Sequence, residues 1–111
     1  MKLVARLPIA ELRERPLTRV EYPPYDVCVT LVEGVPLAIE DSCNHAGASL
    51  AEGWLEEECI VCPVHQYAFH LRSGALVRPK GLCAPQRTFV VRQEGTDLVV
   101  YDPFKLVIVG T

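Results

Sequence analysis

Two short segments of the chain each pair a cysteine with a histidine. The first reads Cys43-Asn44-His45, and the second, sixteen residues later, reads Cys62-Pro63-Val64-His65. In an extended chain, residues i and i+2 project to the same side, so Cys43 and His45 can reach one centre. A tight turn does the same for Cys62 and His65. Because thiolates and imidazoles are metal ligands, we predict a metal centre held between two loop tips.

Two kinds of centre suit two thiolates and two imidazoles. One is a tetrahedral zinc ion, and the other is a 2Fe-2S cluster with both cysteines on one iron and both histidines on the other. An empty, vestigial site is a third alternative. The residue types alone leave these interpretations open.

The order Cys-x-His, sixteen residues, Cys-Pro-x-His resembles the ligand pattern of the Rieske family. The resemblance extends over nearly the whole chain, through Gly47, Leu50, Gly53, Trp54, Phe69, Gly74, Pro85 and the segment from Val90 to Tyr101. It implies a 2Fe-2S cluster bound by Cys43, His45, Cys62 and His65. It also implies an all-β fold, a small antiparallel β-sandwich or barrel with two cluster-binding loops at one tip and a third loop containing Pro85.

The chain departs from the high-potential members of that family at the positions implied to surround the cluster. Ala48 and Val64 occupy the positions of two cysteines that form a disulfide in those members. Tyr67 and Phe69 stand where a serine and a tyrosine donate hydrogen bonds, and Gln66 replaces the usual glycine. Since hydrogen bonds toward the sulfurs favour the reduced cluster, we expect a low reduction potential for this family.

The length of 111 residues leaves no room for a second catalytic iron site or a nicotinamide or flavin domain beside a cluster. We therefore expect no catalytic residues and no enzymatic turnover. The resemblance implies a soluble ferredoxin that carries one electron from a flavoprotein reductase to a terminal oxygenase, such as a dioxygenase, or a related oxidoreductase. A small Rieske-like subunit of an NAD(P)H-dependent nitrite reductase is the alternative. A structural module holding zinc is the third class.

The remaining cysteines and His70 have plainer interpretations. Cys59 and Cys62 form a CxxC sequence, but in a strand-like run they point to opposite faces, so we do not expect a shared metal. Cys59 and Cys28 are predicted to be buried apolar thiols. Cys83 lies beside the expected cluster loop, where it either packs passively or is open to oxidation. His70 is expected to be a partly exposed polar residue.

Short β-branched segments separated by turn residues predict an all-β domain. Glycine-containing turns at 33–34, 72–74 and 94–97 predict three hairpins. A single turn of helix is expected from Ile9 to Arg15, because Pro16 stops it. The predicted strands are Leu3 to Leu7, Asp26 to Val32, Val35 to Glu40, Trp54 to Val61, Tyr67 to Leu71, Ala75 to Arg78, Thr88 to Gln93 and Leu98 to Asp102.

Length and charge limit the remaining possibilities. We expect one domain spanning residues 1–111, since a chain of this size forms a single small core. The net charge of −3 and the scattered Lys and Arg residues speak against a nucleic-acid partner. No apolar run approaches the roughly 20 residues of a membrane span, and the N-terminus does not resemble a signal peptide. Five cysteines cannot all pair, which favours free thiols in a reducing cytoplasm. We expect a monomer.

Overall fold

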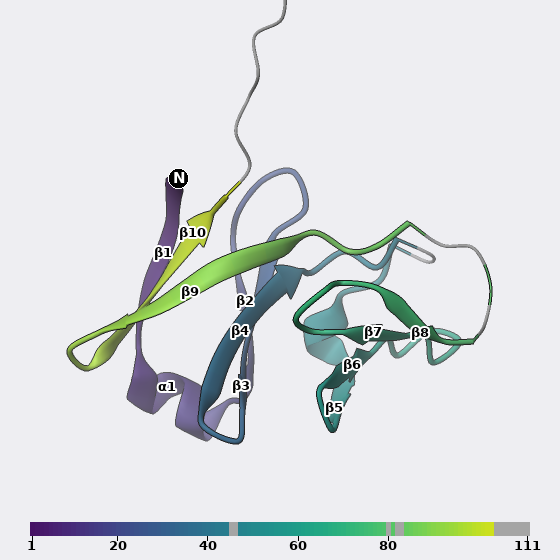
Figure 1. Cartoon of the computed structure of the whole chain (residues 1–111), viewed down its shortest axis with the longest axis horizontal. Coiled ribbons are helices and arrows are strands. Elements are labelled where there is room, and N and C mark those ends of the chain that lie inside the picture. Colours follow the sequence, from purple (N-terminus) through teal and green to yellow (C-terminus); the bar gives the residue numbers. More distant parts are fainter. Residues whose placement is uncertain (45–46, 80, 82–83, 104–111) are drawn as a thin grey trace, which may run out of the picture.

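The computed structural model describes residues 1–44, 47–79, 81 and 84–103. Two antiparallel sheets make up most of this part of the chain, a larger one on the left of Figure 1 and a smaller one on the right. The larger sheet is a curled half-barrel with the strand order β1-β10-β9-β4-β3-β2, and the smaller has the order β5-β6-β7-β8. The predicted all-β fold class is therefore confirmed.

The strands of the larger sheet come from both ends of the described chain. They are β1 (Lys2–Pro8), β2 (Leu17–Val20), β3 (Val27–Val32), β4 (Val35–Glu40), β9 (Thr88–Glu94) and β10 (Asp97–Asp102). β1 pairs with β10, and β9 closes the sheet onto β4 through Ala38 opposite Phe89 and Ile39 opposite Thr88. The smaller sheet lies entirely between β4 and β9 in sequence. The whole smaller sheet is thus an insertion carried by two neighbouring strands of the larger one.

The smaller sheet consists of four short strands. These are β5 (Trp54–Glu56), β6 (Cys59–Val61), β7 (Ala68–His70) and β8 (Leu76–Arg78), preceded by the 3-10 helix η1 (Leu50–Glu52). The predicted single strand from Trp54 to Val61 is wrong, because the chain turns at Glu57 and returns as β6. Glu57 adopts a φ of +56°, so a non-glycine residue makes this turn. The three predicted hairpins are confirmed, and this fourth one joins them.

Two further elements bear on the sequence predictions. The expected turn of helix is present as α1 (Ile9–Glu14), with Leu12 fully buried. β2 was not predicted, and it forms by pairing antiparallel to β3 from Leu17 opposite Thr30 to Val20 opposite Val27. Within the described residues, no helix is long and apolar enough to cross a membrane.

β3 is buried on both faces and so joins two cores. Val27 and Val29 point into the half-barrel, where they pack with Leu12 and Phe89. Cys28, between them, points to the opposite side and belongs to a second core with Ile39 of β4. That second core continues into the smaller sheet and its loops through Cys43, Leu50, Ile60, Cys62, Phe69 and Leu71. The two cysteines predicted as ligands are therefore seated on the apolar core between the sheets.

Candidate metal centre

The first ligand loop leaves β4 and turns back on itself around Cys43. The Cys43 backbone N–H donates to the Ala48 carbonyl at 2.9 Å, and the Gly47 N–H donates to the Cys43 carbonyl at 2.7 Å. Only 2% of the Cys43 surface is exposed. The loop's own hydrogen bonds thus fix the backbone while its thiol points inward. His45 lies outside the described residues, so its predicted place beside Cys43 stays a prediction.

The second ligand loop connects β6 to β7 and carries Cys62 and His65. The Cys62 backbone N–H donates to the Tyr67 carbonyl at 2.7 Å, which closes the turn. His65 and Gln66 adopt φ values of +62° and +56°, a left-handed conformation uncommon for non-glycine residues. This geometry explains why glycine suits the position that Gln66 occupies. Cys62 is fully buried, whereas His65 is exposed at the outer end of the turn.

Cys43 and Cys62 are buried in the same core, and their side chains lie close enough to interact. Burial, with a smaller contribution from the contact with Cys43, raises the pKa of the Cys62 thiol to about 11. The backbone N–H of Val64 donates to the Cys62 sulfur, which stabilises the thiolate and lowers the pKa. Without a metal the Cys62 sulfur thus remains protonated near neutral pH. If these thiols bind the metal as predicted, binding releases protons, since the thiolate is the ligand form of cysteine.

The two buried cysteines fit the thiolate side of an iron-sulfur cluster, and the histidine side of the site is exposed. Two buried thiols lie at the apolar bottom of the site, and an exposed imidazole lies on its solvent side. Among the described residues, no group of three or more His, Cys, Asp or Glu side chains surrounds a single point. The structure therefore brings together two of the four predicted ligands, places His65 on the turn that Cys62 begins, and does not describe His45.

The burial of the other described cysteines and of His70 is largely as expected. Cys28 is fully buried in the core beneath the site, and burial raises the pKa of its thiol. Cys59, predicted to be buried, is only partly so, because it lies on β6 opposite His70 at the open side of the smaller sheet. His70 is partly exposed, with its Nε2 3.9 Å from Glu58. Cys83 lies outside the described residues.

Tyr67 and Phe69, which stand where high-potential relatives have a serine and a tyrosine, differ in burial. Phe69 lies at the centre of β7, is fully buried and brings no hydrogen-bonding group to the core. Tyr67 is half-buried and accepts the Cys62 N–H through its backbone carbonyl. The Tyr67 backbone thus anchors the second loop, and its side chain is not needed for this contact.

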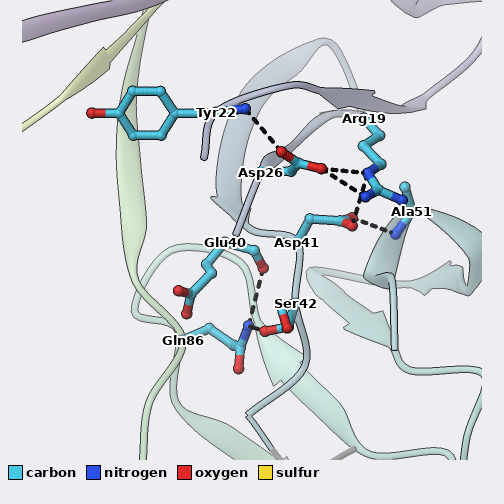
Figure 2. A network of polar contacts seen from close by, with 8 residues as sticks. All are labelled: Arg19, Tyr22, Asp26, Glu40, Asp41, Ser42, Ala51 and Gln86. Atoms are coloured by element: carbon cyan, nitrogen blue, oxygen red, sulfur yellow. Dashed lines mark hydrogen bonds and ion pairs between the residues drawn. The ribbon is translucent and has the colours of Figure 1, made fainter. Parts of the chain in front are cut away.

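A buried carboxylate, which the sequence analysis missed, anchors the start of the first ligand loop (Figure 2). Asp41 is 2% exposed and accepts the Ala51 N–H at 2.9 Å, which ties the loop to η1. Arg19 of β2 lies 3.6 Å from the other Asp41 oxygen and donates to Asp26 at 2.6 Å and 2.9 Å. β2, itself unpredicted, therefore supplies the positive charge that balances the buried carboxylate.

A second anchor comes from Gln86, just before β9 (Figure 2). Its side-chain Nε2 donates to the Glu40 carbonyl at 3.0 Å and to the Ser42 carbonyl at 2.8 Å. No local pattern marks Asp41 or Gln86, because their partners in the loop are 10 and more than 40 residues away. Only the fold brings these groups together.

Comparison with known proteins finds close agreement over most of the chain. Residues 2–89 match the family model described as the Rieske [2Fe-2S] domain. The ferredoxin component of a biphenyl 2,3-dioxygenase from Rhodococcus jostii is 40% identical over 86 residues, covering 76% of this chain and 78% of the relative. The ferredoxin subunit of a 3-phenylpropionate/cinnamic acid dioxygenase from Escherichia coli K12 is 33% identical, covering 90% and 93%.

Solved structures agree with the fold. A chain in the complex of reduced oxygenase and oxidised ferredoxin of a carbazole 1,9a-dioxygenase superposes with a TM-score of 0.79 at 27% identity, covering 96% of both chains. The ferredoxin of carbazole 1,9a-dioxygenase from Nocardioides aromaticivorans gives 0.78 at 29% identity, covering 91% of this chain and 98% of that one.

Proposed function

Because the chain belongs to the Rieske 2Fe-2S family, we propose that it is a ferredoxin that carries single electrons from a flavoprotein reductase to a terminal oxygenase. The family supplies the cofactor, a 2Fe-2S cluster, which when bound accepts and releases one electron. The relatives at 33% and 40% identity are named as ferredoxin components of dioxygenases. These names favour the oxygenase system over a nitrite reductase subunit.

The observation that carries the proposal is the pair of neighbouring buried thiols beneath an exposed histidine turn. Cys43 and Cys62 are buried in one core with their side chains in contact, while His65 of the second loop is exposed. We assign Cys43 and Cys62 to one iron and His45 and His65 to the other. The cysteine end is then insulated by the core, and electrons enter and leave at the histidine end.

The role of a carrier follows from this arrangement. The chain itself contributes ligands, an apolar floor and an exposed edge, and no residue is assigned to turnover of an organic substrate. We propose that residues 1–111 form one domain, because the smaller sheet is inserted between β4 and β9 and shares a core with the larger one. We also propose that the protein acts as a monomer. The free thiols of Cys28 and Cys59 suit a reducing cytoplasm.

The ligand set is tested with paired substitutions. The purified protein should be red-brown with about two irons and two acid-labile sulfides per chain. Cys43→Ala and His65→Ala should lose the cluster, whereas Cys59→Ala, three residues from Cys62 in the CxxC sequence, should keep it. Retention of iron by Cys43→Ala together with its loss from Cys59→Ala would reverse the assignment.

The carrier role is tested with the same holoprotein. A flavoprotein reductase with NAD(P)H should bleach its visible absorption, and addition of an oxidised terminal oxygenase should restore it. The isolated protein should convert no aromatic substrate. Substrate oxidation by the holoprotein alone, or reduction without reoxidation by the oxygenase, would contradict the proposal.

A further inference from the structure

We propose that Gln86 and Asn44 form a clasp that sets the position of the Cys43 loop relative to the Cys62 loop. The clasp is defined by the side chains of these two residues and the backbone groups that they bind. It rests on the proposed function, because its purpose is to hold the two thiolates at the separation a cluster requires. Gln86 and Asn44 are positioning residues in this role and are not ligands.

The Gln86 carboxamide grips the loop on both sides of Cys43. Its Nε2 donates to the Ser42 carbonyl at 2.8 Å, and its Oε1 accepts the Asn44 backbone N–H at 2.7 Å. The second Nε2 hydrogen binds the Glu40 carbonyl at 3.0 Å, at the end of β4. Both donors and the acceptor of the amide are thus used. The opposite amide orientation would set an NH2 group against the Asn44 N–H, so the assignment is determined by chemistry.

Asn44 completes the clasp from the other direction. Its side-chain Nδ2 donates to the Ala84 carbonyl at 2.8 Å and to the Pro85 carbonyl at 2.9 Å. The loop therefore binds the 84–86 segment through side chains reaching both ways. Asn44 stands between the two ligand positions of the Cys-x-His pair, so its backbone cannot move without moving Cys43.

The backbone of Gln86 links the clasp to the second ligand loop. The Gln86 N–H donates to the Gly74 carbonyl at 2.8 Å, in the turn between β7 and β8. The backbones of Gly74 and Gln86 lie so close together that a Cβ on Gly74 would be 2.0 Å from the Gln86 carbonyl oxygen. β7 in turn pairs with β6, which leads directly into Cys62. Gln86 is therefore a bridge whose side chain holds one loop and whose backbone rests on the sheet that holds the other.

Burial makes this bridge stiff. Gln86 is 2% exposed, so its hydrogen bonds are shielded from water and each unmade bond leaves a buried polar group. Nothing covalent links Ala48 and Val64, the positions at which the resemblance places a disulfide in high-potential relatives. In this chain the clasp supplies a non-covalent connection between the loops.

Gln86→Met on the holoprotein tests the clasp, with Gln93→Met as the matched control. Both remove a glutamine amide of equal size without changing charge, but Gln93 is exposed on β9 and its Nε2 donates to the nearby Gly95 carbonyl at 3.2 Å. In Gln86→Met, iron release to a chelator and amide exchange at Asn44 should each be about tenfold faster, the effect of a lost buried hydrogen bond. The EPR spectrum of the reduced cluster should also shift. Gln93→Met should match the wild type in all three.

A merely stabilising role predicts a different result. In that case Gln86→Met would speed amide exchange equally in β9 and β10 while leaving the EPR spectrum and iron release unchanged, and the proposal would be overturned. If Gln86→Met does not fold, Asn44→Ala decides, because Asn44 is exposed and its loss spares the core. Iron release about threefold faster is expected there, for the loss of weaker exposed bonds. Iron release from Asn44→Ala at the wild-type rate would refute the clasp.

The two proposals fail separately. A wild-type protein without iron and sulfide would refute the proposed function, and Asn44 exchange in Gln86→Met would still report on the clasp. A wild type that holds a reducible cluster, beside a Gln86→Met variant identical to it in exchange, EPR and iron release, would refute the clasp alone.

Discussion

Replacing Gly74 by alanine should destabilise the protein far more than the same change at Gly34. Both glycines lie in hairpin turns, with φ values of +77° and +79°, so both substitutions place a Cβ in the left-handed region. That strain costs roughly 1–2 kcal/mol at either position. The gain from a less flexible unfolded chain is also shared, and it cancels between the two variants. What differs is the space around the new methyl group.

At Gly34 a Cβ would have no atom within 4 Å, whereas at Gly74 it would lie 2.0 Å from the Gln86 carbonyl oxygen and 3.0 Å from its carbon. Since real Cβ atoms essentially never come within 3.0 Å of such an atom, the backbones must separate by about 1 Å. The bond from the Gln86 N–H to the Gly74 carbonyl then weakens, and the buried carboxamide is pulled from its partners. With about 1 kcal/mol for the bond and 1–3 kcal/mol for unsatisfied groups, the total is about 3–6 kcal/mol.

Thermal unfolding of the two holoproteins, followed by far-UV circular dichroism at one fixed scan rate, measures the difference. At about 4 °C per kcal/mol for a chain of this length, the additional cost of about 2–4 kcal/mol at Gly74 should lower the Tm of Gly74→Ala by about 8–16 °C more than that of Gly34→Ala. Gly74→Ala should also release iron faster than Gly34→Ala at temperatures where both are folded. Equal Tm losses, or equal iron release, would show that the contact between Gly74 and Gln86 does not hold the loops.

Two further predictions concern charge. The Tyr22 N–H and the Arg19 guanidinium lower the pKa of Asp26, so its carboxylate stabilises the fold above the unfolded pKa of about 3.9 and loses this effect as pH falls through the lower folded value. Asp26→Asn should therefore lower Tm at pH 7 and converge with the wild type in acid, and parallel Tm curves across pH would contradict this. The reduction potential should lie in the low part of the range of about −150 to +300 mV and fall in alkali, because Phe69 donates no hydrogen bond and no disulfide joins positions 48 and 64. Voltammetry across pH measures it, and a midpoint well above +200 mV at pH 7 would refute the argument.

The candidate ligands and most strands could be predicted from sequence because both depend on local spacing. The two cysteine-histidine pairs are short motifs, and β-branched runs bounded by glycine-containing turns mark β3, β4, β9 and β10. β2 was not predicted because its four residues are too few to show a strand pattern in the sequence. Pairing with β3 is what makes them a strand. The turn between β5 and β6 was not predicted because Glu57, and not a glycine, adopts the left-handed conformation there.

The groups that position the ligands could not be predicted, since their partners are remote in sequence. Asp41 looks like an ordinary acidic residue after a strand, yet it is buried because Arg19 and the Ala51 N–H compensate its charge. Gln86 looks like a surface residue in a proline-containing loop, yet 42 and 44 residues separate it from the loop groups that it binds. Their roles depend on the curled sheet bringing the end of β4 beside the start of β9.

The placement of these two anchors suggests how the chain separates folding from ligand geometry. Asp41 and Arg19 attach the first loop to the larger sheet, whose strands pair without any contribution from the site. Gln86 and Asn44 attach the same loop to the smaller sheet through Gly74. Cys43 lies between the two attachments, so the relative position of the sheets determines where its sulfur meets Cys62. A change that loosens one anchor should therefore alter cluster properties before it unfolds either sheet, which is why iron release and the EPR spectrum are more sensitive measures here than Tm.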